Sequence, residues 1–303
     1  MDKIAFVFSG QGAQYDGMGK ELYDENKAAR LIFENADLLR QGTSQQCFYG
    51  SKEILSETIN TQPCLFCVDL ASAYALKNVG IIPYAVAGFS LGELAALTFA
   101  DTLQFKEGFG LVCKRAVFMQ EAAVKSESTM VAVLKMEAEK VKEICGKFEY
   151  TYPVNYNCKD QTVVALKKKS IDDFCNAVKE LGGRTVPLSV NGGFHSPFMN
   201  EVKVKLFKEL ENVTLSKPSL PVYSNSTAMP YEANIKELLS CQVNSPVLWQ
   251  NTIENMMAEG INTFVEVGAG NTLVKLIKKI SPNSNVFNVE NSESLNNTLK
   301  ALL

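Results

Sequence analysis

The sequence predicts an α/β fold in which a larger domain with a parallel sheet is interrupted by a smaller, ferredoxin-like unit of βαββαβ order. Near both ends of the chain, apolar strand-like runs alternate with helical segments, which is typical of a parallel sheet. Residues 130–190 follow their own strand–helix–strand–strand–helix–strand order. A length of 303 residues is enough for two domains. We predict a larger domain of residues 1–126 and 193–303, and an inserted domain of residues 127–192.

The composition is that of an ordinary globular protein, with 46% hydrophobic and 21% charged residues. The net charge is −3 and no dense basic block is present, so we expect no nucleic-acid partner.

The most apolar stretch, from Tyr84 to Ala100, is interrupted by Ser90 and Glu93, so no membrane span is expected. The apolar run from Ile4 to Phe8 is too short for a signal peptide. We therefore expect a cytoplasmic protein. The sequence contains no obvious coiled-coil or strand-exchange segment, which favours a monomer.

The first predicted strand, Lys3 to Phe8, runs into a glycine-rich loop, SGQGAQYDGMG. Gly10 and Gly12 suggest a dinucleotide fingerprint, but a tyrosine stands where the third glycine belongs. A second candidate, Gly268 to Gly270 after the strand-like TFVEV, lacks the third glycine as well. We expect no bound cofactor. Both segments are interpreted as loops at strand ends, where the backbone approaches another group closely.

Eight cysteines are scattered along the chain without a framework spacing, which predicts reduced thiols. Cys64 and Cys67 form the one CxxC, in an apolar helical segment that we expect Pro63 to open. A zinc site needs two more ligands, and neither a second CxxC nor an HxxxH is present. We therefore predict no metal site and interpret both cysteines as small buried hydrophobic residues.

The inserted unit has four predicted strands and two predicted helices. The second helix is expected to begin with Ser170 and Asp173 as a capping pair and to stop at Gly182-Gly183. The strands are MVAVLK, YTYPVNYNC, QTVVALKKK and RTVPLSV, and the helices are EAEKVKEICGKF and SIDDFCNAVKELGG.

The strongest chemical signal is the G-x-S-x-G motif from Gly88 to Gly92, which has Ser90 at its centre. An apolar strand precedes the motif, and a helix with Leu94 and Leu97 on its apolar face follows it. This is the context of a nucleophile elbow, and it predicts an α/β-hydrolase-like domain. The backbone N–H of Leu91 and the helix dipole would both face a developing oxyanion. The alternative is a packing turn in which the serine caps the helix.

The chain contains one histidine, His195. A lone histidine is more often structural than catalytic, but a serine nucleophile needs a base, and the ordinary pKa of histidine suits that task. It lies in VNGGFHSP, after the last predicted strand of the inserted unit, where the chain returns to the larger domain. We therefore predict that His195 is the base for Ser90, in a cleft between the domains.

Motifs along nearly the whole chain resemble those of the malonyl-CoA:acyl carrier protein transacylase family. Several are individually weak, but their order and spacing are specific. They are F-x-F-x-GQGAQ at the N-terminus, TQP from Thr61, GFSLGE around Ser90, KRAVFMQEA from Lys114, PVNYN from Pro153, GGFHSP around His195, QVNSPVLW from Gln242 and EVGAG from Glu266.

The resemblance implies ping-pong acyl transfer through a covalent malonyl-enzyme. Ser90 would take the malonyl group from coenzyme A as an ester and lose it to the phosphopantetheine thiol of acyl carrier protein. His195 would act first as general base and then as general acid. The backbone carbonyl of Gln242 would orient this histidine, and the N–H groups of Gln11 and Leu91 would form the oxyanion hole.

The resemblance also implies that Arg115 holds the malonyl carboxylate by a bidentate pair. Without it, Arg115 would be interpreted as a solvated helix residue. Malonyl-CoA and acyl carrier protein are then the expected partners. Coenzyme A arrives and leaves as part of the substrate, so no resident cofactor is implied.

One position departs from the family pattern: Phe89 stands where the family usually has a histidine directly before the nucleophile. This leaves the base unaffected but changes the polarity beside the expected malonyl pocket. Gly193-Phe194-His195 resembles the malonyl-selecting form of the family motif, in which a bulky aromatic residue disfavours a branched methylmalonyl unit.

Three alternatives to a fatty-acid malonyltransferase remain at this stage. A stand-alone polyketide acyltransferase would use the same chemistry and the same residues. An editing hydrolase would not need the carboxylate clamp of Arg115. An inactive scaffold that binds carrier protein would not need Ser90, His195 and Arg115 together.

Overall fold

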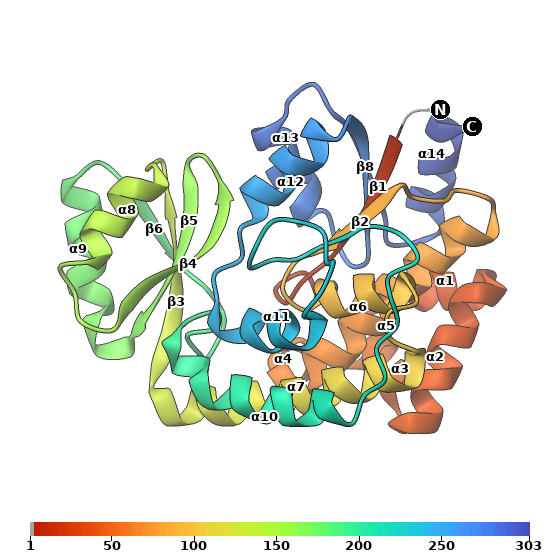
Figure 1. Ribbon diagram of the computed structural model, residues 1–303, viewed down its shortest axis with the longest axis horizontal. Helices are drawn as coiled ribbons and strands as arrows, with labels where there is room; N and C mark the ends of the chain where they lie inside the picture. Colours follow the sequence, from red (N-terminus) through yellow and green to blue (C-terminus); the bar gives the residue numbers. More distant parts are fainter. Residues whose placement is uncertain (1–2) are drawn as a thin grey trace.

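The computed structural model describes residues 3–303, and a five-stranded parallel sheet forms the centre of the larger unit (Figure 1). The strand order is β7-β2-β1-β8-β9, and all neighbouring pairs are parallel. Parallel strands require crossover connections, so helices cover both faces of such a sheet. The strands are β1 (Lys3–Phe8), β2 (Ala85–Gly88), β7 (Val222–Tyr223), β8 (Ile261–Val267) and β9 (Asn285–Val289).

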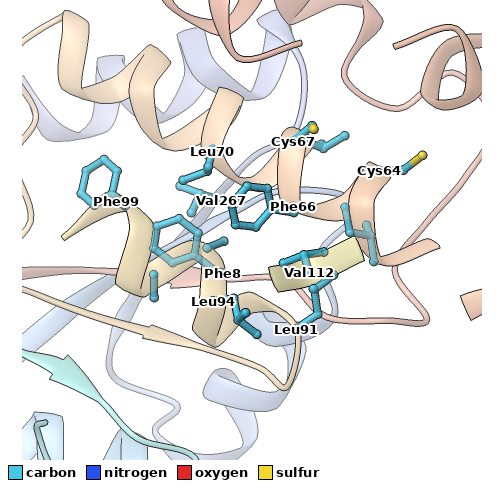
Figure 2. Packing of buried hydrophobic residues seen from close by; sticks show 14 of the residues in the cluster. Phe8, Cys64, Phe66, Cys67, Leu70, Leu91, Leu94, Phe99, Val112 and Val267 are labelled. Carbon is cyan, nitrogen blue, oxygen red and sulfur yellow. The ribbon is translucent and has the colours of Figure 1, made fainter. Parts of the chain in front are cut away.

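The two faces of this sheet have separate cores, because successive side chains of a strand point to opposite sides. Phe6 and Phe8 face a large core that contains α5 and α6, whereas Ala5 and Val7 face a smaller core that contains α12 and α13. Figure 2 shows Phe8 in the larger core with Leu94, Phe99 and Val267. These four helices are α5 (Thr58–Asn78), α6 (Gly92–Phe99), α12 (Trp249–Ala258) and α13 (Thr272–Ile280).

The remaining helices of the larger unit surround these layers. No helix within the described residues is both long and apolar enough to cross a membrane. The remaining helices are α1 (Lys20–Glu25), α2 (Lys27–Leu39), α3 (Thr43–Tyr49), α4 (Lys52–Ser56), α7 (Phe105–Ser126), α10 (Asn200–Glu211), α11 (Ile235–Cys241) and α14 (Ser292–Leu302), with the 3-10 turns η2 (Pro197–Met199) and η3 (Gln242–Asn244).

A four-stranded antiparallel sheet with two helices lies to one side of the larger unit (Figure 1). Its strand order, β4-β5-β3-β6, and the βαββαβ order along the chain confirm the ferredoxin-like arrangement. The predicted boundaries at 126/127 and 192/193 stay a prediction. The elements are β3 (Ser128–Leu134), α8 (Ala138–Cys145), β4 (Thr151–Cys158), β5 (Gln161–Lys167), η1 (Lys168–Ser170), α9 (Ile171–Glu180) and β6 (Arg184–Pro187).

One face of the antiparallel sheet packs against its own two helices, and the opposite face packs against the larger unit. Val131 and Val133 pack against α8 and α9, whereas Met130 belongs to the large core of the parallel-sheet unit. Backbone hydrogen bonds also connect the two units. The N–H of Tyr156 in β4 donates to the carbonyl of Val247 over 2.9 Å, on the segment between α11 and α12. The segment that follows Gln242 is therefore held by the antiparallel sheet as well as by the larger unit.

Two predicted helix starts differ from the structure. Helix α5 begins at Thr58, so Pro63 lies inside it rather than opening it. Contacts with other helices hold this early turn: the N–H of Ile59 donates to Gln120 Oε1 in α7 over 3.0 Å. Ser170 makes no side-chain cap to α9, because it ends the 3-10 turn η1 and lacks the extended backbone of a capping residue. The predicted stop is confirmed by Gly182, which has φ +84°.

The CxxC cysteines lie in the large core, as predicted (Figure 2). Cys64 and Cys67 are both fully buried. Burial raises the pKa of the Cys67 thiol well above its ordinary value, which keeps it protonated and unreactive. The interpretation as small buried hydrophobic residues is therefore confirmed.

Candidate active site

The turn between β2 and α6 carries Ser90 at the carboxyl edge of the parallel sheet. Ser90 has φ +54°, a left-handed conformation that is uncommon for a residue other than glycine. Asn225, which follows β7, holds this conformation: its Oδ1 accepts from the Ser90 N–H over 2.8 Å, and its Nδ2 donates to the Gly88 carbonyl over 2.6 Å. The predicted sharp turn is present, and the strand next to β2 supports it.

The glycines of the G-x-S-x-G motif are required by close backbone contacts. A Cβ atom on Gly88 would lie 1.9 Å from the backbone carbon of Gly92. A Cβ atom on Gly92 would lie 2.3 Å from the carbonyl oxygen of Phe8 in β1. Any side chain at either position would push the helix α6 away from the sheet. The motif therefore encodes the close approach of α6 to β1 and β2.

His195 lies against Ser90, on the segment between β6 and α10. Its Nε2 is 2.7 Å from Ser90 Oγ, and its Nδ1 is 2.9 Å from the backbone carbonyl oxygen of Gln242. Because a carbonyl only accepts, Nδ1 carries the proton and Nε2 is free to accept from the serine hydroxyl. His195 also has φ +60°, and its own N–H donates to the Val243 carbonyl over 2.9 Å. The turn η3 thus fixes both the backbone and the ring of the histidine.

The environment of His195 keeps the imidazole neutral. Burial disfavours the charged ring, and the nearby Arg115 cation repels it, so the pKa of His195 is lowered to about 4. The hydrogen bond to Gln242 opposes this shift, but a neutral carbonyl stabilises an imidazolium less than a carboxylate would. At neutral pH the histidine is therefore in the form that accepts a proton.

Arg115, on α7, is nearly fully buried beside the serine and the histidine. Its Nη2 donates to Ser90 Oγ over 3.1 Å and to Gln242 Oε1 over 2.9 Å, and its Nη1 donates to Gln62 Oε1 over 2.8 Å. Burial lowers the pKa of this guanidinium to about 10, which still leaves it charged at neutral pH. A buried cation that meets mainly neutral oxygen atoms is suited to bind a carboxylate. The helix pattern without the family resemblance would have placed this residue in solvent, whereas the resemblance placed it at the site, where the structure buries it. Its role as the carboxylate clamp stays a prediction.

The two predicted oxyanion-hole residues lie at the ends of neighbouring strands. Leu91 is the residue before α6, and its side chain is buried in the large core (Figure 2). Gln11 follows β1, and this loop lies against the serine turn, because a Cβ atom on Gly10 would be 2.5 Å from the Phe89 carbonyl. The backbone N–H groups of Gln11 and Leu91 donate to no acceptor within residues 3–303. Their role in the oxyanion hole stays a prediction.

Several residues at this site were not assigned a role from the sequence. Gln62 and Glu93 lie within quoted motifs, TQP and GFSLGE, but the motifs do not say what their side chains contact. Asn225 and Tyr231 lie in a segment with no recognisable pattern. The side chain of Gln242 was missed as well: its Nε2 donates to the Ser90 carbonyl over 2.5 Å and to Glu93 Oε2 over 2.9 Å.

Comparison with known proteins agrees with this geometry. Residues 5–294 match the family model described as acyl transferase domain. A malonyl CoA-acyl carrier protein transacylase of Bacillus subtilis (strain 168) is 38% identical, and the match covers 100% of this chain and 98% of that protein. The chain belongs to the malonyl CoA-acyl carrier protein transacylase family.

Solved structures of this transacylase family share the whole fold. The malonyl CoA-acyl carrier protein transacylase from Clostridium perfringens has a TM-score of 0.95 and 37% identity, over 99% of this chain and 97% of that one. A malonyl-transacylase solved in complex with a type II polyketide acyl-carrier protein also has a TM-score of 0.95, at 29% identity and 99% coverage of both chains.

Phe89, the departure from the transacylase family pattern, packs against an aromatic neighbour. Its ring meets the buried Trp249 edge-on at 5.4 Å between centroids. We expect Phe89→His to leave turnover within roughly tenfold, a change of about 1.4 kcal/mol in the barrier, because the predicted base is His195. Steady-state kinetics of the variant measures this. A change of a hundredfold or more would mean that position 89 takes a direct part in the chemistry.

Proposed function

We propose that this protein transfers a malonyl group from malonyl-CoA to the phosphopantetheine thiol of acyl carrier protein, as an acyltransferase of fatty acid synthesis. The observation that carries the proposal is the convergence of three side chains. Ser90 Oγ lies 2.7 Å from a base, His195, and 3.1 Å from a buried cation, Arg115. The first two supply an activated nucleophile, and the third selects an acyl group that carries a carboxylate.

In the first half-reaction, Ser90 Oγ attacks the thioester carbonyl carbon while His195 Nε2 takes the hydroxyl proton. The N–H groups of Gln11 and Leu91 would stabilise the oxyanion of the tetrahedral intermediate. When the carbon–sulfur bond breaks, His195 returns the proton to the sulfur, and coenzyme A leaves as a thiol. The malonyl group remains as an ester on Ser90, with its carboxylate on Arg115.

In the second half-reaction, His195 takes the proton of the phosphopantetheine thiol, and the sulfur attacks the ester carbonyl. The proton then passes to Ser90 Oγ as the ester bond breaks. The hydrogen bond from Nδ1 to the Gln242 carbonyl keeps Nε2 directed at the serine in both steps.

The identity of the carrier protein separates the first function from a second candidate. A relative at 29% identity was solved with a type II polyketide carrier protein, which favours a polyketide acyltransferase as that candidate. The two functions use the same site residues. Parallel kinetics with a fatty-acid carrier protein and a polyketide carrier protein would distinguish them by the ratio of kcat/KM values.

Intact mass spectrometry after mixing with malonyl-CoA tests the proposed function. We expect one malonyl group per chain, stable until holo acyl carrier protein is added and then transferred to it. An inactive scaffold would show no adduct. An editing hydrolase would release the malonyl group to water, so the adduct would disappear at the same rate with and without carrier protein.

The low pKa of His195 predicts how malonyl loading depends on pH. A neutral imidazole is required, and the pKa is lowered to about 4, so kcat/KM for malonyl-CoA should not fall between about pH 7 and about pH 5. Loading should be lost as the pH drops through about 4. Stopped-flow release of coenzyme A measures this, with circular dichroism as the control for unfolding. A midpoint near the ordinary histidine value of about 6.5 would contradict the prediction.

A further inference from the structure

Glu93 is a fully buried carboxylate in the first turn of α6, three residues after the nucleophile. Its Oε1 accepts from the hydroxyl of Tyr231. Its Oε2 accepts from the backbone N–H of Asn225 over 3.2 Å and from Gln242 Nε2 over 2.9 Å. The proposed mechanism gives this carboxylate no role.

The amide of Gln242 links Glu93 to Arg115. Its Nε2 donates to Glu93, while its Oε1 accepts from Arg115 Nη2 over 2.9 Å. One amide group thus separates a buried negative charge from a buried positive charge. Burial lowers the pKa of Arg115, and within the described residues the negative charge of Glu93 opposes this by raising it.

We propose that Glu93 sets how strongly Arg115 holds the malonyl carboxylate, and that Glu93 takes up a proton when the malonyl group binds. This inference rests on the proposed function. In the free protein, Glu93 balances the buried charge of Arg115. A bound malonyl group brings a second carboxylate to the same cation. When two carboxylates share one cation in a buried site, their mutual repulsion favours protonation of one of them. Protonation of Glu93 removes the repulsion.

The surroundings of Glu93 support this exchange. Burial raises the pKa of Glu93 to about 7, while hydrogen bonds from Tyr231 and Gln242 and the charge of Arg115 oppose that shift. The titratable groups that face it are Arg115 from α7 and Tyr231 from the segment after β7, and Asn225 and Gln242 are neutral. A malonyl carboxylate on Arg115 weakens the attraction that keeps Glu93 charged, so its pKa rises further. An acetyl group has no such effect.

The test is the ratio of kcat/KM for malonyl-CoA to kcat/KM for acetyl-CoA, followed against pH. The ratio cancels effects common to both substrates, such as the state of His195. In the wild-type protein it should fall about tenfold between about pH 6 and about pH 8, because binding coupled to uptake of one proton weakens tenfold per pH unit above the pKa. In Glu93→Gln the ratio should not change over this range. A ratio that falls equally in Glu93→Gln would overturn the inference.

Tyr231→Phe serves as a matched variant that retains the carboxyl group. Loss of its hydroxyl removes a hydrogen bond that stabilises the charged form of Glu93, so the fall in the ratio should move to higher pH. This keeps the inference testable if Glu93→Gln does not fold, because an unchanged midpoint in Tyr231→Phe would contradict it. If the wild-type protein forms no malonyl adduct at any pH, the proposed function itself fails. If the adduct forms and the wild-type ratio is independent of pH, only the inference fails.

Discussion

Ser90→Ala protein should form no malonyl adduct when it is mixed with malonyl-CoA. The hydroxyl oxygen of Ser90 is the atom that would carry the ester, and it lies 2.7 Å from Nε2 of His195, the proposed base. Intact mass spectrometry measures the adduct. Ser56→Ala, at an exposed serine in α4, is the matched control and should load normally. Malonyl transfer through another residue in the Ser90→Ala protein would show that the nucleophile is assigned wrongly.

His195→Ala should slow loading by several orders of magnitude without abolishing it. The variant retains the predicted oxyanion hole and the proposed carboxylate clamp, and in related triads such features keep a residual acceleration of roughly 10³–10⁴-fold over water. Stopped-flow release of coenzyme A from malonyl-CoA measures the rate. A loading rate close to that of the wild-type protein would exclude His195 as the base.

Arg115→Ala should lose malonyl loading by about a hundredfold or more, while acetyl-CoA loading stays equal or improves. Malonyl differs from acetyl by one carboxylate, and each hydrogen bond to a charged group contributes about 1.5–3 kcal/mol, so a bidentate pair accounts for several kcal/mol. At about 1.4 kcal/mol for each factor of ten, that is at least a hundredfold. The measurement is kcat/KM for both substrates in each protein.

Arg115→Lys should fall between the wild-type protein and Arg115→Ala. Lysine keeps the charge but lacks the planar pair of donors that now reach Gln62 and Gln242. The thermal midpoint of each variant is the control, because Arg115→Ala also leaves these two amide oxygens without their donor. A parallel decline with malonyl-CoA and acetyl-CoA would mean that Arg115 supports the fold or binds coenzyme A.

The sequence by itself determined most of the fold and the centre of the site. G-x-S-x-G between an apolar strand and a helix predicted the turn that carries Ser90, because only glycines allow α6 to approach β1 and β2 so closely. A nucleophilic serine needs a base, and His195 is the one histidine in the chain. The βαββαβ order of the small unit was equally clear, because its short strands and helices have distinct sequence patterns and are separated by turn residues such as Gly182-Gly183.

Only the tertiary structure decided how the side chains around Ser90 and His195 contact one another. A charged residue on an amphipathic helix has the same local signature whether it faces water or a buried site, so without the family resemblance the helix pattern could not place Arg115 at the site. Likewise, Glu93 and Gln242 lie 149 positions apart in the chain, and nothing in their local sequence indicates that they share a hydrogen bond. Packing α6, α7 and η3 at one edge of the sheet brings these side chains together and removes them from water. Burial then shifts the pKa values of Glu93 and Arg115, because the solvation of an ionised group depends on its three-dimensional surroundings rather than on its neighbours in the chain.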